Sequence, residues 1–122
     1  MQSRSRHGAC AERIAAEYLE ARGLSVVARN LRCRAGELDL VCRDANVLAI
    51  VEVRQRARLD YGGALGSVTR RKQRRIIRAA SFFLQRLPQW RNYKIRFDVF
   101  ALQGTPDGTH HIAWIKDAFR AT

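Results

Sequence analysis

The fold is decided by the stretch GELDLVCRDANVLAIVEVR, residues 36–54. Its two halves, Glu37–Arg43 and Val47–Arg54, each alternate apolar and polar residues, and a short polar turn over 44–46 lies between them. Alternation of this kind places one face of a strand in a core and the other toward polar surroundings. The two segments therefore predict an antiparallel hairpin whose second strand, with its longer apolar run, lies near the centre of a sheet.

Helix and strand signals continue on both sides of this hairpin. Gly23 ends a segment in which apolar residues recur at helical spacing, and Pro88 ends a second, longer one. Other segments that are rich in Val, Leu, Ile or Phe are short and bounded by turn residues, which is typical of strands. The expected elements are a helix over 8–22, a strand over 24–31, a helix capped by Ser67 or Thr69 and running to Leu87, strands over 94–102 and 110–115, and a closing helical turn over 117–120.

The resulting order α-β-β-β-α-β-β predicts an α/β fold, a sandwich with a central mixed sheet flanked by helices. The second helix is long enough to be a crossover between parallel strands. With 122 residues, the chain can bury one sizeable core. We therefore expect a flexible basic arm over 1–7 and a single domain over 8–122.

The charge balance favours a polyanionic partner. Lys and Arg number 23 against 11 Asp and Glu, the net charge is +12, and arginine makes up almost all of the basic residues. Arginine binds phosphates in two-point geometry, so nucleic acid is the favoured partner, while a solvated basic surface or an acidic or ribosome-associated protein is the alternative. The second helix concentrates these charges on one face: Arg70, Arg71, Lys72, Arg74, Arg75 and Arg78.

Several classes of protein are disfavoured. The longest apolar run, Val47–Val51, is far shorter than the ~20 residues of a membrane span, and no apolar stretch follows the N-terminal charges as in a secretory signal. The three cysteines form no CxxC pair and match no common zinc module. We expect reduced thiols in a cytoplasmic protein without a membrane partner.

Two carboxylates are predicted to face each other in the hairpin. An even-numbered turn pairs Asp39 with Glu52 across the strands, with Cβ atoms about 4.5–5.5 Å apart, whereas an odd-numbered turn would put them on opposite faces. Facing acids on a buried strand repel, and an unpaired buried charge is costly. Mg²⁺ or Mn²⁺ bound by Asp39 and Glu52 is one solution, because hard divalent cations prefer carboxylate oxygens.

Other partners for these acids stay open at this stage. Glu12 lies at the edge of the apolar stripe of the first helix, where it can act as a third ligand or orient a water. Alternatively, Glu52 pairs with Arg54 or Arg56, and Asp39 pairs with another arginine, in a purely structural network. Glu37 is either an extra acid at the metal or a cross-strand partner of Arg54, and the second role is favoured.

Several motifs in one order resemble a known family. They are Gly8-x3-Glu12, Arg29-Asn30, the hairpin motifs Gly36–Leu40 and Val51–Arg56, Val68–Gln73, Arg96–Val99 and Trp114–Phe119. The chain resembles the YraN-type family of uncharacterised bacterial proteins, which is itself similar to Holliday-junction resolvases of the PD-(D/E)xK nuclease-like superfamily. The resemblance implies a restriction-endonuclease-like sandwich, phosphodiester hydrolysis with Mg²⁺ or Mn²⁺, and a homodimer.

The same resemblance implies roles for individual residues. Asp39 and Glu52 match the two acids of the motif, the Val53 carbonyl is a further metal ligand, and Glu12 lies where the resolvases have a helical acid. Arg54 occupies the position of the motif lysine. Arginine can stabilise developing negative charge, but with a pKa above ~12 it cannot act as a base. Lys72 could bring an ammonium group to the site, although a solvated position on the basic face is the preferred interpretation.

Two functions follow as hypotheses. The first is a metal-dependent nuclease that binds and cleaves structured or branched DNA, with Glu12, Asp39, Glu52 and Arg54 as catalytic residues. The second is a catalytically inactive module of the same fold that binds DNA, or RNA in a ribosome-associated role. The arginine at position 54 is the feature that separates them.

Overall fold

A computed structural model describes residues 6–56, 66–104 and 109–121. The elements are α1 (Arg6–Ala21), β1 (Ser25–Cys33), β2 (Gly36–Asp44), β3 (Val47–Arg56), α3 (Arg70–Arg86), the short 3-10 helix η1 (Pro88–Trp90), β4 (Lys94–Gly104) and β5 (His110–Phe119). This order confirms the predicted α/β architecture.

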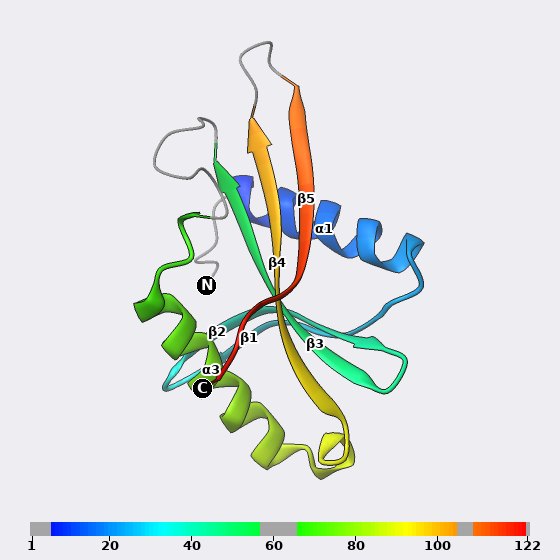
Figure 1. Ribbon diagram of the computed structural model, residues 1–122, viewed down its shortest axis with the longest axis vertical. Helices are drawn as coiled ribbons and strands as arrows, with labels where there is room; N and C mark the ends of the chain where they lie inside the picture. Colours follow the sequence, from blue (N-terminus) through cyan, green and yellow to red (C-terminus); the bar gives the residue numbers. More distant parts are fainter. Residues whose placement is uncertain (1–5, 57–65, 105–108, 122) are drawn as a thin grey trace.

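The five strands form one sheet in the order β1-β2-β3-β4-β5. Neighbouring strands are antiparallel except β3 and β4, which are parallel, so the sheet is mixed as expected. The chain between β3 and β4 contains α3, which makes the predicted crossover. Figure 1 shows α1 and α3 on opposite sides of the twisted sheet.

Each face of the sheet has its own apolar core. On one face, α1 packs through residues such as Ala15 and Leu19 against Val51 and Phe100. On the other face, α3 packs through Ile76 and Phe83 against strand residues that include Ile50 and Val99. Along β3, Ala49 and Val51 belong to the α1 core whereas Leu48 and Ile50 belong to the α3 core, so the alternation places Glu52 and Arg54 on the α3 side.

Thr69 is the N-cap of α3. Its backbone is extended, and its Oγ1 accepts a hydrogen bond from the Lys72 backbone N–H at 3.3 Å. The helix ends at Arg86, one residue before the predicted end and two residues before Pro88. Of the two expected caps, Thr69 therefore has this role, and the Ser67 hydroxyl is available for another contact.

The C-terminal part of the sheet corrects one prediction. A helical turn over 117–120 is wrong, because β5 continues to Phe119. The pairing register with β4 shifts between Phe97 and Val99, and Asp117 adopts a φ of 55° at this irregularity. The Asp117 N–H donates to the Asp98 carboxylate at 3.0 Å. This hydrogen bond replaces the backbone pairing that the register shift interrupts.

The N-terminal helix begins at Arg6, two residues before the predicted start, and its C-terminal boundary is one residue short of the prediction. The five residues before α1 lie outside the described part of the chain, so the basic arm stays a prediction. Residues 57–65, between β3 and α3, also lie outside it. Neither α1 nor any other helix of the described residues has the length and apolar character needed to cross a bilayer.

The cysteines Cys10, Cys33 and Cys42 are free. Burial is the main reason that the pKa of the Cys42 thiol rises to about 12, with a further contribution from Asp98. Cys42 therefore remains a neutral thiol at physiological pH and packs as part of the α1 core.

Candidate acidic site beside a basic helix

The hairpin register brings Asp39 and Glu52 to opposing positions. The pair Asp44↔Val47 closes a two-residue turn, the even number that the predicted pairing requires, and the last ladder pair is Leu40↔Val51. Beyond this pair, a side chain replaces the backbone as the hydrogen-bond acceptor. The Val53 backbone N–H donates to Asp39 Oδ2 at 2.9 Å, so the Asp39 side chain occupies the place where β2 and β3 separate.

Glu52 is the more perturbed of the two acids. Its side chain is 12% exposed. Burial, followed by the charge of Asp39 and a side-chain hydrogen bond to it, raises the pKa of Glu52 to about 8, while Arg54 and Lys72 act in the opposite direction. At neutral pH Glu52 is therefore mostly protonated, because burial and the charge of Asp39 together outweigh the opposing effect of Arg54 and Lys72.

Arg54 is held beside this pair by two contacts. Its Nη1 lies 3.4 Å from Glu52 Oε2, and its Nε donates to Ser67 Oγ at 2.8 Å. The alternative expectation, that Glu52 pairs with Arg54, is thus also realised, and the acid pair persists beside it. The expected pairing of Arg54 with Glu37 is wrong, because Glu37 pairs in register with Arg32 of β1, and its carboxylate lies 3.9 Å from that guanidinium.

The sequence does not predict the roles of Ser67 and Lys72 in this site. For Ser67 it predicts only a helix cap, because no local pattern shows that its hydroxyl reaches a strand residue. Lys72 is half-buried, unlike the arginines around it. Burial, followed by the charges of Arg54 and Arg56, lowers the pKa of its ammonium group, and Glu52 opposes this shift. Lys72 is therefore only partly solvated, and it interacts electrostatically with Glu52. The sequence feature that points to this role of Lys72 is its position in the first turn of α3, next to the cap residue Thr69.

Glu12 has a different environment. It is buried, with 6% exposure, and it lies on α1, the helix that covers the other face of the sheet. Among the residues that the structure describes, no group of three His, Cys, Asp or Glu side chains is placed to hold a metal ion. The structure thus brings Asp39 and Glu52 together, and Glu12 does not complete a three-acid cluster with them.

The donor set nevertheless fits a hard divalent cation. Mg²⁺ usually keeps several waters and is bound through one or two carboxylates together with substrate phosphates. Asp39 and Glu52 supply two carboxylates, and a bound cation would replace the proton that now relieves their repulsion. Val53 follows Glu52 in β3 and its N–H contacts Asp39 of β2, and the carbonyl of Val53 is the further ligand implied by the family resemblance.

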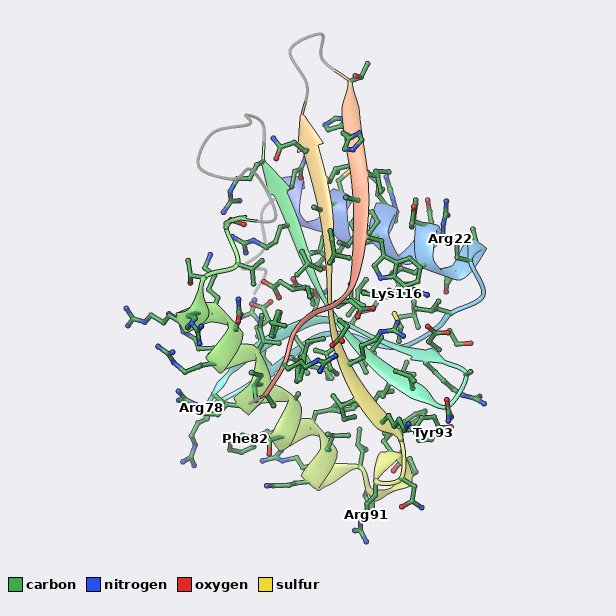
Figure 2. All side chains as sticks on the ribbon, viewed as in Figure 1. Arg22, Arg78, Phe82, Arg91, Tyr93 and Lys116 are labelled. Atoms are coloured by element: carbon green, nitrogen blue, oxygen red, sulfur yellow. The ribbon has the colours of Figure 1, made fainter. Side chains whose placement is uncertain are left out.

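The α3 arginines form an exposed basic face beside this site. Arg70, Arg71, Arg74, Arg75 and Arg78 are all exposed, and the helix contains no acidic residue. Cations in the first turn of a helix oppose the positive end of its dipole, so the arrangement is favourable only when an anion is near. Figure 2 shows Arg78 extending from the outer side of α3 into the surroundings.

The sequence pattern of a known family matches residues 11–102, a range that includes Glu12, both acids of the pair and all of α3. The chain belongs to the uncharacterised protein family UPF0102. A UPF0102 protein of Pseudomonas putida strain GB-1 is 50% identical over 117 residues, which cover 96% of this chain and 95% of the relative. A UPF0102 protein of Halorhodospira halophila is 49% identical over 110 residues, which cover 90% of this chain and 84% of the relative. The predicted membership of the YraN-type family of uncharacterised proteins is thereby confirmed, and the similarity to nucleases stays a prediction.

Proposed function

We propose that this UPF0102 protein is a metal-dependent nuclease that binds and cleaves structured or branched DNA. The observation that carries the proposal is the Asp39–Glu52 pair. Two partly buried carboxyl groups oppose each other at the end of a strand ladder, directly beside a helix with an exposed arginine face. A structural role does not require a second acid at this place, whereas two opposed carboxylates supply the oxygen ligands that a divalent cation prefers.

The chain's own residues would divide the work as follows. The arginines of α3 bind the phosphate backbone and hold the scissile phosphate near the acid pair. Asp39 and Glu52 would hold Mg²⁺ or Mn²⁺, which when bound lowers the pKa of a coordinated water and neutralises charge on the phosphate. Arg54, fixed by Ser67, stabilises the negative charge that develops during hydrolysis.

Lys72 is proposed to supply what Arg54 cannot. A guanidinium does not release a proton near neutral pH, whereas the ammonium group of Lys72 has a lowered pKa and lies in the field of Glu52. Lys72→Arg keeps the positive charge, but a guanidinium group does not release a proton near neutral pH. We expect cleavage to fall by at least about tenfold in this variant while DNA binding is retained. Equal cleavage by wild type and Lys72→Arg would restrict Lys72 to binding.

The central test is cleavage of four-way junction, flap, single-stranded and duplex DNA by the purified protein with Mg²⁺ or Mn²⁺. Asp39→Ala should lower the rate by about a hundredfold or more, since it removes one of two ligands. Asp117→Ala is the matched control, because it removes an exposed aspartate of β5 whose carboxylate pairs with Arg120. No cleavage by wild type, or equal cleavage by Asp39→Ala, would refute the nuclease proposal.

The arginine at position 54 favours a second candidate, a binding module that has lost catalysis. This module would bind DNA or RNA with an affinity whose logarithm falls with the logarithm of salt concentration, with a slope of about −0.9 per phosphate contacted on duplex DNA. Arg54→Lys separates the two candidates. If this substitution creates cleavage that the parent lacks, the parent is a binding module.

A further inference from the structure

A second group of cations and aromatic rings lies at the opposite end of α3 from the acid pair. We call it the η1 patch and define it by Arg43, Trp90, Arg91, Tyr93 and Lys94. The Trp90 and Tyr93 rings meet edge to face with centroids 4.9 Å apart, and the Arg43 guanidinium lies 6.0 Å from the Tyr93 centroid. Both rings are half-buried, and the three cations are exposed.

The rings of the η1 patch are held in place by the backbone. The N–H of Trp90 donates to Leu87 O, and the N–H of Tyr93 donates to Trp90 O, both at 3.1 Å. The start of β4 is tied to the β2–β3 turn by a bond from Lys94 N to Asn46 O at 3.4 Å. One side of each ring packs against the α3 core. The patch is therefore ordered without a ligand, so a partner would not have to order it.

The charge of the patch has one sign. Arg43, Arg91 and Lys94 surround the rings, and the nearest acid along β2, Asp44, is already bound to Arg96 at 3.0 Å. Aromatic rings that only cover the edge of a hydrophobic core do not require cations around them. Rings interleaved with exposed cations are typical of surfaces that bind single-stranded nucleic acid, where bases stack on the rings and phosphates contact the cations.

We propose that the η1 patch binds unpaired nucleotides of the same nucleic acid whose backbone follows α3, with a base stacked on Trp90 or Tyr93. This inference rests on the proposed function, because it assumes that the α3 arginines bind nucleic acid. It defines the substrate more narrowly: the favoured ligand has a single-stranded segment next to the phosphates held near Asp39 and Glu52.

The length of α3 sets the spacing between the two sites. Its 17 residues span about 25 Å at ~1.5 Å per residue. At ~3.4 Å per stacked nucleotide, this corresponds to about seven nucleotides along one strand. Figure 2 shows Tyr93 and Arg91 at the end of the molecule where α3 terminates, and Arg78 and Phe82 along the helix. We therefore expect duplexes with a single-stranded extension of about seven or more nucleotides to bind more tightly than blunt duplexes.

The test compares two charge-reversed proteins of equal net charge. Arg91→Glu with Lys94→Glu changes the η1 patch at exposed positions. Arg22→Glu with Lys116→Glu is the matched control, because these exposed cations also lie over aromatic rings, at 3.5 Å from the Tyr18 centroid and 4.7 Å from the Trp114 centroid. Figure 2 shows the control positions near α1, away from Arg91.

Binding of labelled single-stranded, blunt-duplex and extended-duplex DNA should then be measured in EDTA. The η1 double variant is expected to lose about tenfold or more in affinity for the single-stranded and extended DNA, and to lose its preference for the extension. The control is expected to lose less than about threefold. Equal losses in both variants would overturn the proposal, since they would reflect net charge alone.

Trp90→Phe gives a second readout that does not depend on charge. An aromatic ring is kept, so binding should stay within about threefold of wild type, while the quenching of tryptophan fluorescence by single-stranded DNA should largely disappear. Undiminished quenching in Trp90→Phe would place the stacked base elsewhere and contradict the proposal.

The two proposals fail in distinguishable ways. If wild type binds duplex DNA through the α3 arginines but the η1 variants leave single-stranded binding unchanged, only the inference about the η1 patch is wrong. If the protein binds no nucleic acid, both proposals are wrong. If the η1 double variant alone loses single-stranded binding but wild type cleaves no DNA, the patch is supported and the nuclease proposal is wrong.

Discussion

Asp98 lies at a register shift of one strand ladder and the Asp39–Glu52 pair lies just beyond the end of another. In both places a carboxylate accepts a backbone N–H, from Asp117 or from Val53. Around Asp98 the donors are numerous. Its carboxylate is fully buried and accepts two bonds from Arg96 at 2.9 Å and one from Trp114 Nε1 at 3.1 Å. The bonds to Asp98 and Asp44 raise the pKa of Arg96 further.

The Asp39–Glu52 pair has the opposite balance. A second carboxyl group lies where Asp98 has an arginine fork, and the one ion pair of Glu52 with Arg54 is longer, at 3.4 Å. A buried acid surrounded by donors stabilises a fold only while every partner stays in place. A desolvated acid that faces another acid is costly unless a cation arrives, which is why we assign structure to the first centre and function to the second.

Removing the Asp98 charge should have the largest effect on stability. Asp98→Asn leaves the partly buried Arg96 without its bidentate partner and places an amide N–H₂ among donors. We expect the free energy of unfolding to fall by about 3–5 kcal/mol, measured by urea denaturation at pH 7. Asp39→Asn should destabilise the protein much less in the same experiment, because a protonated Glu52 does not need an ionised partner and the amide oxygen still accepts the Val53 N–H. Equal destabilisation by the two variants would remove the distinction between the centres.

The contrast between the centres also marks how far the sequence could predict them. Asp39 and Glu52 could be predicted to lie opposite each other because an even-numbered turn between their strands fixes the pairing register. Strand alternation then puts both side chains on the same face. Asp98 could not be recognised as the centre of a network. Its partners Trp114 and Asp117 meet it only through a register shift, and a helical turn was expected at that place. Ser67 and Lys72 depend on how α3 packs against β3, which no periodicity within α3 specifies.

The next largest effect is expected in how the stability of the Asp39–Glu52 pair depends on pH. The pKa of Glu52 is raised from its ordinary 4.5 to about 8, so between these values the folded protein binds more protons than the unfolded chain. The contribution of the protonated acid is fully present below pH 4.5 and is lost as the pH rises through about 8. In EDTA, Glu52→Gln should therefore be more stable than wild type at about pH 9, by at most about 5 kcal/mol, since the pKa rises from 4.5 to about 8 and each pKa unit equals about 1.4 kcal/mol. The two proteins should be nearly equal at about pH 5, and a constant difference at both pH values would contradict this assignment.

A divalent cation should stabilise one centre and leave the other unaffected. At a Mg²⁺ or Mn²⁺ concentration about tenfold above the dissociation constant, wild type should gain about 1.4 kcal/mol by mass action. Asp39→Asn should lose this gain, whereas a milder change in the Asp98 centre, Trp114→Phe, should keep it. Thermal unfolding with and without the ion measures both. A gain that survives in Asp39→Asn would place the ion elsewhere.

The smallest effect distinguishes how the two arginines are held. Arg96 donates to Asp44 and Asp98, whereas Arg54 donates to a single acid and to the Ser67 hydroxyl. Ser67→Ala removes one hydrogen bond at a partly buried place, so the loss in unfolding free energy should be about 1 kcal/mol. Thr69→Ala should cost a similar amount by removing the cap of α3.

If Arg54 acts on the scissile phosphate, cleavage should fall further in Ser67→Ala than in Thr69→Ala at equal stability, because only the first substitution removes the hydrogen bond that holds the Arg54 guanidinium. Parallel losses in both variants would reduce Arg54 to a structural partner of Glu52, the role that Arg96 has for Asp98.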